Sequence, residues 1–166
     1  MNYYSSAFPV LTSSKGIAYE IYLAGCKGYC DGCHSKHTWD FNAGKPMEEV
    51  WPRLRDSLLE NRKFFDNVVI MGGEPLDHDD LPVLLQELDK LLPDKDIYVY
   101  THFGPVMVNK KFPWLKELVD YLKVGDYDPG CPPGEPDPLT GVTLATSNQY
   151  FIKGDRRSAK RDGEAK

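Results

Sequence analysis

The sequence has no long apolar run, no excess of basic charge and few cysteines. None of its uncharged stretches reaches the roughly 18 apolar residues that a membrane-spanning helix requires, so we expect no membrane association. The net charge is −5, whereas nucleic-acid-binding domains carry an excess of Lys and Arg, so we expect no nucleic acid as a partner. The first ten residues, MNYYSSAFPV, lack the basic start and the apolar middle of a secretory signal. We therefore expect a cytoplasmic protein.

The length of 166 residues fits one domain with one core. Hydrophobic residues make up 41% and charged residues 27%, which is ordinary globular composition and argues against a disordered chain. The end of the chain differs, because residues 153–166 contain six Lys or Arg, three acidic residues and no large apolar side chain. We expect a single domain over residues 1–152 and a basic, flexible, solvated tail over 153–166.

Strand and helix signals alternate along the chain. Strands are predicted where β-branched and aromatic residues gather, over 17–23, 68–71, 97–100 and 121–124. Helices are predicted where apolar residues recur at helical spacing, over 50–58, 81–92 and 114–119, and a Gly- and Pro-rich loop over 126–138. This alternation is typical of βαβ units. Because a full eight-stranded barrel needs about 250 residues, we expect a small α/β domain, a partial (βα) barrel with a curved, mostly parallel sheet.

Three of the four cysteines, Cys26, Cys30 and Cys33, fall within eight residues directly after the first predicted strand. A disulfide framework spreads cysteines so as to close long loops, so this clustering indicates a metal site instead. Three thiolates leave such a site one protein ligand short. A structural zinc ion would take His37 or His34 as the fourth ligand. An iron–sulfur cluster would leave one iron open to a small molecule.

A second motif, the turn Gly72-Gly73-Glu74-Pro75, follows the next predicted strand. Glycines expose backbone polar groups to a ligand, and the Glu74 carboxylate can accept a bond from a cationic amine. Thr101 and His102 follow the strand after that. Since ligands bind at the carboxyl ends of parallel strands, we expect the cysteine loop, this turn and residues 101–102 to meet at one rim. Cys131 lies far downstream in the Pro-rich loop, and we expect it outside the site.

Together, the C-x3-C-x2-C spacing and the Gly-Gly-Glu-Pro turn resemble the radical S-adenosylmethionine (SAM) superfamily. Within it, the short chain resembles the proteins that activate anaerobic ribonucleoside-triphosphate reductase. This resemblance is carried by residues 30–34, by the Thr-Trp-Asp-Phe-Asn-Ala-Gly segment at 38–44 and by the Ser-Asn-Gln segment at 147–149. The chain departs from that family at Ala18, where an arginine is usual, and in the enlarged loop over 126–139.

The resemblance implies a 4Fe-4S cluster whose protein ligands are Cys26, Cys30 and Cys33. It also implies that SAM chelates the fourth iron through its methionyl part. The SAM amino group would be held by Gly73 and Glu74. The nucleoside part of SAM would lie near the end of the cysteine motif, at Gly32, Cys33 and His34.

The implied reaction is the reductive cleavage of SAM to methionine and a 5′-deoxyadenosyl radical, which takes a hydrogen atom from a glycine of the partner. The implied partners are the glycyl-radical subunit of anaerobic ribonucleoside-triphosphate reductase and an electron donor such as a flavodoxin. Two alternatives stay open. One is another small radical SAM enzyme, either a different glycyl-radical activase or a deazaguanine synthase. The other is a zinc-binding interaction domain.

Overall fold

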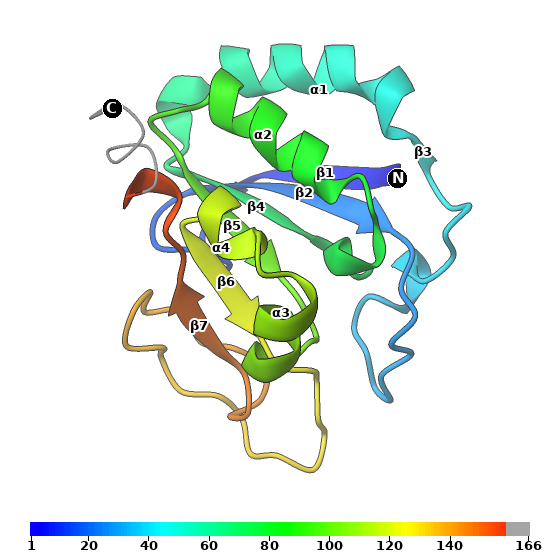
Figure 1. The fold of residues 1–166 in the computed structure, drawn as a ribbon, viewed down its shortest axis with the longest axis vertical. Helices are drawn as coiled ribbons and strands as arrows, with labels where there is room; N and C mark the ends of the chain where they lie inside the picture. The colour runs from blue at the N-terminus through cyan, green and yellow to red at the C-terminus, as the bar shows by residue number, and fades with distance from the viewer. Residues whose placement is uncertain (159–166) are drawn as a thin grey trace.

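The computed structural model describes residues 1–158, and its centre is one seven-stranded sheet with the order β3-β1-β2-β4-β5-β6-β7. The strands are β1 (Asn2–Val10), β2 (Ala18–Ala24), β3 (Lys45–Pro46), β4 (Asn67–Gly72), β5 (Asp96–Tyr100), β6 (Tyr121–Val124) and β7 (Tyr150–Lys153). The four central strands, β2, β4, β5 and β6, are parallel. Antiparallel pairing adds β1 and β3 at one edge and β7 at the other. The expected α/β class with an open sheet is confirmed (Figure 1).

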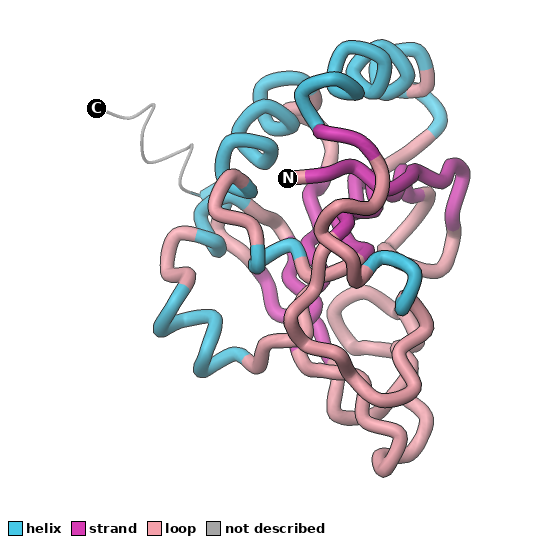
Figure 2. The backbone as a smooth tube through the Cα atoms, turned by 90° about the vertical axis from the view of Figure 1, so that its right-hand side faces the viewer, coloured by secondary structure: helices cyan, strands magenta, loops and turns pink. Residues whose placement is uncertain are grey.

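Helices alternate with the strands along the described part of the chain. They are α1 (Met47–Glu60), α2 (Leu81–Leu91), α3 (Pro105–Lys111) and α4 (Leu115–Leu118), with short 3-10 turns at Lys36–Thr38, Arg62–Phe64 and Pro75–Asp77. Figure 2 shows these helices gathered along one side of the strands, while long loops fill the lower end of the view. No helix within residues 1–158 is long and apolar enough to cross a membrane.

The main hydrophobic core lies between the sheet and the helices. Successive side chains of a strand point to opposite faces, so Val68 and Ile70 of β4 face the helices whereas Val69 faces away. The predicted apolar stripe of α2 meets them with four buried leucines, Leu81, Leu84, Leu85 and Leu88. The alternation of side chains along β4 and the helical repeat along α2 therefore both place apolar side chains in the same core layer.

The opposite face of the sheet is covered by the long segment between β6 and β7. Val142 and Leu144 of this segment pack with Val69 and Tyr98 in a second hydrophobic cluster. Asp137 fixes the segment, because its carboxylate accepts hydrogen bonds from backbone N–H groups inside the segment and from Phe151 N of β7, at 3.0 Å. The expected irregular loop is therefore an ordered cover over the sheet.

The beginning of the basic C-terminal segment departs from the sequence expectation of a solvated tail. Arg156 is only 2% exposed. Its guanidinium donates to the Asp120 carboxylate at 2.8 Å and to the Lys95 carbonyl oxygen at 2.5 Å. The sequence around Arg156 does not predict this burial, because the partners of its ion pairs lie far away in the chain. Residues 159–166 of the predicted tail lie outside the described residues.

Candidate functional site

The carboxyl ends of the four parallel strands surround one cavity of about 380 Å³. The segments that follow the four strands are the cysteine loop, the Gly-Gly-Glu-Pro turn, residues 101–102 and residues 125–127. All three clustered cysteines line the cavity, together with Glu20, Gly73, Glu74, Tyr100, His102, Lys123 and Tyr127. The expected convergence at one rim is confirmed. A larger groove, between β1 and helices α1 and α2, contains none of these residues.

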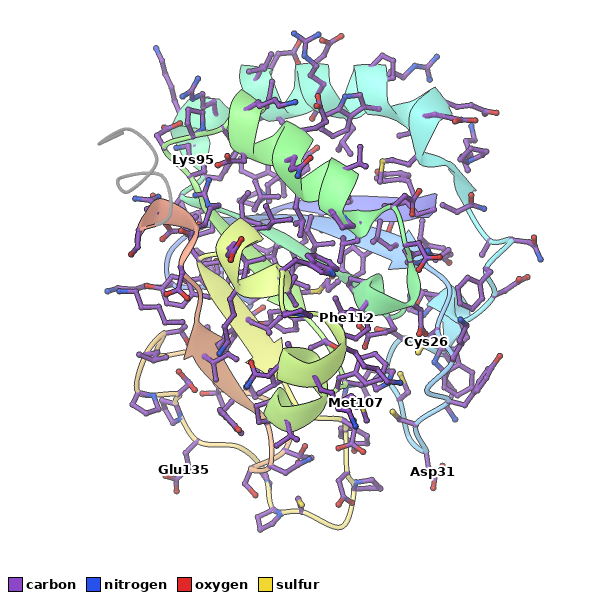
Figure 3. The ribbon with its side chains drawn as sticks, in the orientation of Figure 1. Cys26, Asp31, Lys95, Met107, Phe112 and Glu135 are labelled. Carbon is purple, nitrogen blue, oxygen red and sulfur yellow. The ribbon has the colours of Figure 1, made fainter. Side chains whose placement is uncertain are left out.

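The cysteine loop holds its sulfur atoms with backbone hydrogen bonds. Cys26 is buried, and Cys30 and Cys33 are half-buried. The N–H of Gly28 donates to the Cys26 sulfur and the N–H of Ser35 to the Cys33 sulfur, each at 3.3 Å. Bonds of this kind stabilise thiolate charge and tune iron–sulfur clusters. Figure 3 shows Cys26 beside the body of the protein and Asp31 at the outer tip of the same loop.

The three thiols lie within electrostatic reach of one another. Burial raises the pKa of the Cys30 thiol, neighbouring His102 lowers it, and Asp126 and the other two thiols raise it. Within residues 1–158, no three His, Cys, Asp or Glu side chains are placed to hold one metal ion. The cavity lining nevertheless brings all three cysteines of the loop together, and cysteine thiols are the ligands that iron–sulfur clusters take.

His37 does not complete a zinc site. It is exposed, it is absent from the cavity lining, and its ring packs 5.2 Å from that of Tyr4. His34 does line the cavity, where it is exposed at the mouth. Cys131 is outside the lining, and its thiol lies 3.5 Å from the Asp128 carboxylate. The described residues therefore form neither of the all-protein four-ligand sites that these side chains could have completed.

Glu74 ties the turn after β4 to the end of β5. Its side chain is 1% exposed, and one oxygen accepts the N–H of Leu76 at 2.9 Å. The other oxygen accepts the backbone N–H of His102 at 2.8 Å and lies 2.7 Å from His102 Nδ1. Both carboxylate oxygens thus have hydrogen-bond partners within the chain. Glu74 therefore forms part of the cavity wall whether or not it also contacts a ligand.

His102 carries positive charge at the cavity wall. Burial lowers its pKa, but hydrogen bonds to the side chains of Cys26 and Glu74 outweigh this and raise the pKa to about 10. The imidazolium therefore lies between a carboxylate and a thiol.

Gly73 packs directly on the strand that leads into the cysteine loop. A Cβ atom at this position would lie 2.1 Å from the carbonyl oxygen of Gly25. The N–H of Gly73 donates to Leu23 and that of Glu74 to Gly25, both at 2.8 Å. Glycine is required because two backbone segments touch, and this contact fixes the turn against the cysteine loop. The predicted contact of Gly73 with a ligand amine stays a prediction.

Two buried charged residues of the cavity were missed by sequence reasoning. Glu20 of β2 is 4% exposed and accepts the Tyr22 hydroxyl at 2.5 Å. Lys123 of β6 is 7% exposed, and its ammonium donates to the carbonyl oxygens of Gly125 at 2.6 Å and Thr101 at 3.5 Å. The signal in the sequence was a charged residue inside each apolar strand pattern. Burying such a charge costs free energy unless it has a role in the site or its hydrogen bonds are satisfied there.

Lys123 is expected to make stability depend on pH. Burial lowers its pKa from 10.5 to about 8, against the opposing pull of Glu74 and Asp126. Because the folded-state pKa is the lower one, the unfolded chain binds the proton more tightly. Below pH 8, burial of the ammonium therefore lowers the free energy of unfolding by its full amount. This cost disappears as the pH rises to 10.5. Lys123→Met should raise the free energy of unfolding at pH 7 by up to about 3 kcal/mol.

Urea unfolding of wild type and Lys123→Met between pH 7 and pH 10.5 measures this effect. The difference between the two proteins should shrink as the pH rises. The matched control is Lys153→Met, which removes an exposed lysine of β7 and should show no such convergence. A Lys123→Met difference that stays constant over this range would contradict the assignment.

Comparison with known proteins agrees with this geometry. The chain is 27% identical to the anaerobic ribonucleoside-triphosphate reductase-activating protein of Salmonella typhimurium, over 75% of this chain and 84% of that protein. It is 26% identical to the protein of that name from Escherichia coli K12, over 76% and 85%. It is also 32% identical to a 7-carboxy-7-deazaguanine synthase of Synechocystis, over 60% of this chain and 44% of that protein. No solved structure matches significantly.

The match to a protein family covers most of the site. Residues 13–128 match the family described as "4Fe-4S single cluster domain", and this range includes the cysteine loop, the Gly-Gly-Glu-Pro turn and Lys123. The three cysteines of the loop lie within the matched range and line one cavity. The chain therefore belongs to the family of 4Fe-4S single cluster domain proteins.

Proposed function

We propose that this protein is a radical SAM activase that generates a glycyl radical on an anaerobic ribonucleoside-triphosphate reductase. One observation carries the proposal: the three cluster-spaced thiols and the Gly-Gly-Glu-Pro turn line one cavity at the carboxyl ends of the parallel strands. The names of the Salmonella and Escherichia coli relatives support the choice of partner. Cys26, Cys30 and Cys33 would hold the cluster.

When bound, the cluster and SAM would supply the hard chemistry, which is the one-electron cleavage of a carbon–sulfur bond and the abstraction of a hydrogen atom from the target glycine. The protein positions these groups. Gly73 and Glu74 would face the SAM amino group, and Gly32 and His34 the nucleoside. His102 adds positive charge beside Cys26. Burial of the Glu74 and Lys123 side chains in the wall limits how far these charges can move.

The open sheet suits a large substrate. The strand order leaves two edges instead of closing into a barrel, and the cysteine loop stands at the rim of the cavity (Figure 3). A glycine-bearing loop of the partner enters at this rim in our proposal. A flavodoxin as electron donor and a cytoplasmic location belong to the same proposal.

The first experiment is anaerobic reconstitution with iron and sulfide, followed by reduction with dithionite in the presence of SAM and an assay for 5′-deoxyadenosine. We expect product only with reductant. Adding the anaerobic reductase of the same organism should then give a glycyl-radical signal in electron paramagnetic resonance. A tightly held zinc ion without sulfide or product would contradict radical SAM chemistry. SAM cleavage without any activation of the reductase would contradict the choice of partner.

A second candidate is a radical SAM enzyme that modifies a small polar molecule. The cavity lining favours it, because the Ser13 hydroxyl is buried without a hydrogen-bond partner among the described residues and Glu20 lies in the same lining. The Synechocystis relative is named for a synthase of a small molecule. SAM cleavage stimulated by a purine-like compound, and not by the reductase, would support this candidate.

A further inference from the structure

Glu20 is a buried carboxylate that the cysteine loop and the Gly-Gly-Glu-Pro turn do not use. It lies four residues before β2 ends at Ala24, so about 13 Å of strand separates it from the cysteine loop. Ala18 and Ile21 pack in hydrophobic clusters on opposite faces of the sheet. Because side chains alternate along a strand, Glu20 points to the face of Ala18, opposite the helices, and lines the cavity from there.

The Glu20 carboxylate has few partners in the described part of the chain. One oxygen accepts the Tyr22 hydroxyl at 2.5 Å, and this is the one side-chain hydrogen bond that Glu20 makes within residues 1–158. None of the ion pairs in that range involves Glu20. Burial raises the pKa of Tyr100, and the charge of Glu20 raises it further, so these two side chains are neighbours. A buried charge of this kind costs free energy unless further hydrogen bonds complete it.

The Ser13 hydroxyl is a second polar group without a partner in the same lining. Ser13 is 5% exposed, and its Oγ is buried with no hydrogen bond to any of residues 1–158. Its place beside Tyr100 is fixed, because the Tyr100 hydroxyl donates to the Ser13 carbonyl oxygen at 2.7 Å. Nearly all buried polar side-chain atoms in folded proteins have a hydrogen-bond partner. An unpaired hydroxyl and an incompletely paired carboxylate on one cavity wall therefore indicate a binding site.

The chemistry of these two groups selects the ligand. An ionised carboxylate only accepts hydrogen bonds, whereas a hydroxyl can donate or accept one. A ligand that completes both must bring a donor to Glu20, and repulsion by the carboxylate disfavours an anionic group. The N–H groups of amides, amidines and amines meet both conditions. Met71 and Leu144 add apolar side chains to the same lining, which strengthens a hydrogen bond by keeping water away from it.

From these observations we propose that Glu20 and Ser13 form a substrate subsite that binds an N–H group, with the Glu20 carboxylate as its acceptor. The inference rests on the proposed function and states how the same cavity would hold its substrate. The backbone amides of a glycine-bearing segment of the partner are N–H donors. A purine-like compound, the substrate of the second candidate function, also carries N–H groups, so the test includes both sources.

The test is equilibrium binding under anaerobic conditions to protein loaded with cluster and SAM, with the anaerobic reductase of the same organism and with guanine as separate probes. Glu20→Gln keeps the size of the side chain and an acceptor for the Tyr22 hydroxyl, but it removes the charge. It should weaken binding of the substrate probe about tenfold, the effect of losing a hydrogen bond to a charged group. Ser13→Ala should weaken it about threefold. The affinity for SAM and the content of iron and sulfide should equal those of wild type in both variants.

Glu135→Gln is the matched control. It removes the same charge from an exposed side chain in the long segment between β6 and β7, outside the cavity lining. Figure 3 shows Glu135 at the outer edge of the molecule. Its affinity for both probes should equal that of wild type. Urea unfolding of Glu20→Gln is the second readout, because neutralising a carboxylate that only supports the fold would lower the free energy of unfolding, whereas this variant should not.

Three results would overturn the inference. One is Glu20→Gln that binds the substrate probe as tightly as wild type does. Another is an equal loss for SAM and for the substrate probe, which would place Glu20 in the SAM site. The third is a loss of binding that is matched by a loss of free energy of unfolding. The proposed function fails in a different way: wild type would then bind guanine and not the reductase, and a loss of guanine binding in Glu20→Gln would still support the subsite.

Discussion

Replacing Cys26, Cys30 or Cys33 singly by alanine is expected to abolish cluster assembly and, with it, all SAM cleavage. Each of the three sulfurs lines the same cavity, and no other cysteine lines it. A cluster with three protein thiolates already has one open iron, so the loss of a second ligand leaves two irons exposed to solvent and exchange. Iron and acid-labile sulfide per chain after reconstitution measure the first effect, and 5′-deoxyadenosine the second.

Cys131→Ala is the matched control for these variants. It also removes one thiol, but this thiol lies beside Asp128 in the long segment between β6 and β7, outside the cavity. Its iron and sulfide content should equal that of wild type. Full cluster content in any of the three cavity variants would contradict the ligand assignment. So would a loss of cluster in Cys131→Ala.

The parts of the site that lie within one short segment could be predicted from the sequence. The cysteine spacing and the Gly-Gly-Glu-Pro turn each act through neighbouring residues, and each follows a strand whose apolar pattern is clear. The rule that parallel strands present their carboxyl ends at one edge then brings both segments together. The cavity lining confirms that convergence.

The parts that depend on contacts between distant segments could not be predicted. Tyr127 reaches Gly32 only because β6 ends beside the cysteine loop, and nothing in the sequence around Tyr127 marks it. In the sequence, Lys123 only interrupts an apolar strand pattern. Its burial is explained by the carbonyl oxygens of residues 101 and 125, which accept its hydrogen bonds in the folded protein. The signal for both lies in the tertiary structure.

The edge strands and one helix were also missed, for local reasons. β1 has half-buried residues along almost its whole length and two irregularities in its register, so no alternation of apolar and polar residues shows. β7 has only four residues. α3 begins at Pro105, directly after Gly104, and this pair reads as a turn. The two strands β1 and β7 are set by pairing with β2 and β6 more than by their own pattern.

Arg156→Ala is expected to lower the free energy of unfolding by about 3 kcal/mol or more. The guanidinium is 2% exposed and donates to the carboxylates of Asp120 and Asp89, and to the Lys95 carbonyl oxygen. Removing one partner of a buried ion pair leaves the other charge desolvated, which costs about 3–5 kcal/mol. Asp120 also accepts the N–H of Ile97 at 2.8 Å, so its position affects β5. Urea unfolding at pH 7 measures the loss.

Arg157→Ala provides the comparison within the same segment. Arg157 also pairs with aspartates, at 2.6 Å from Asp96, but its side chain is 52% exposed, and an exposed pair contributes roughly 0–1 kcal/mol. The two adjacent arginines carry the same charge, so net charge cannot explain a difference between them. Equal losses for both variants would contradict the role of burial. If the loss is confined to Arg156, a chain that ends at residue 152 should be destabilised by a similar amount, because it lacks the same guanidinium. The stable unit would then extend to at least residue 156, beyond the boundary that composition alone predicts.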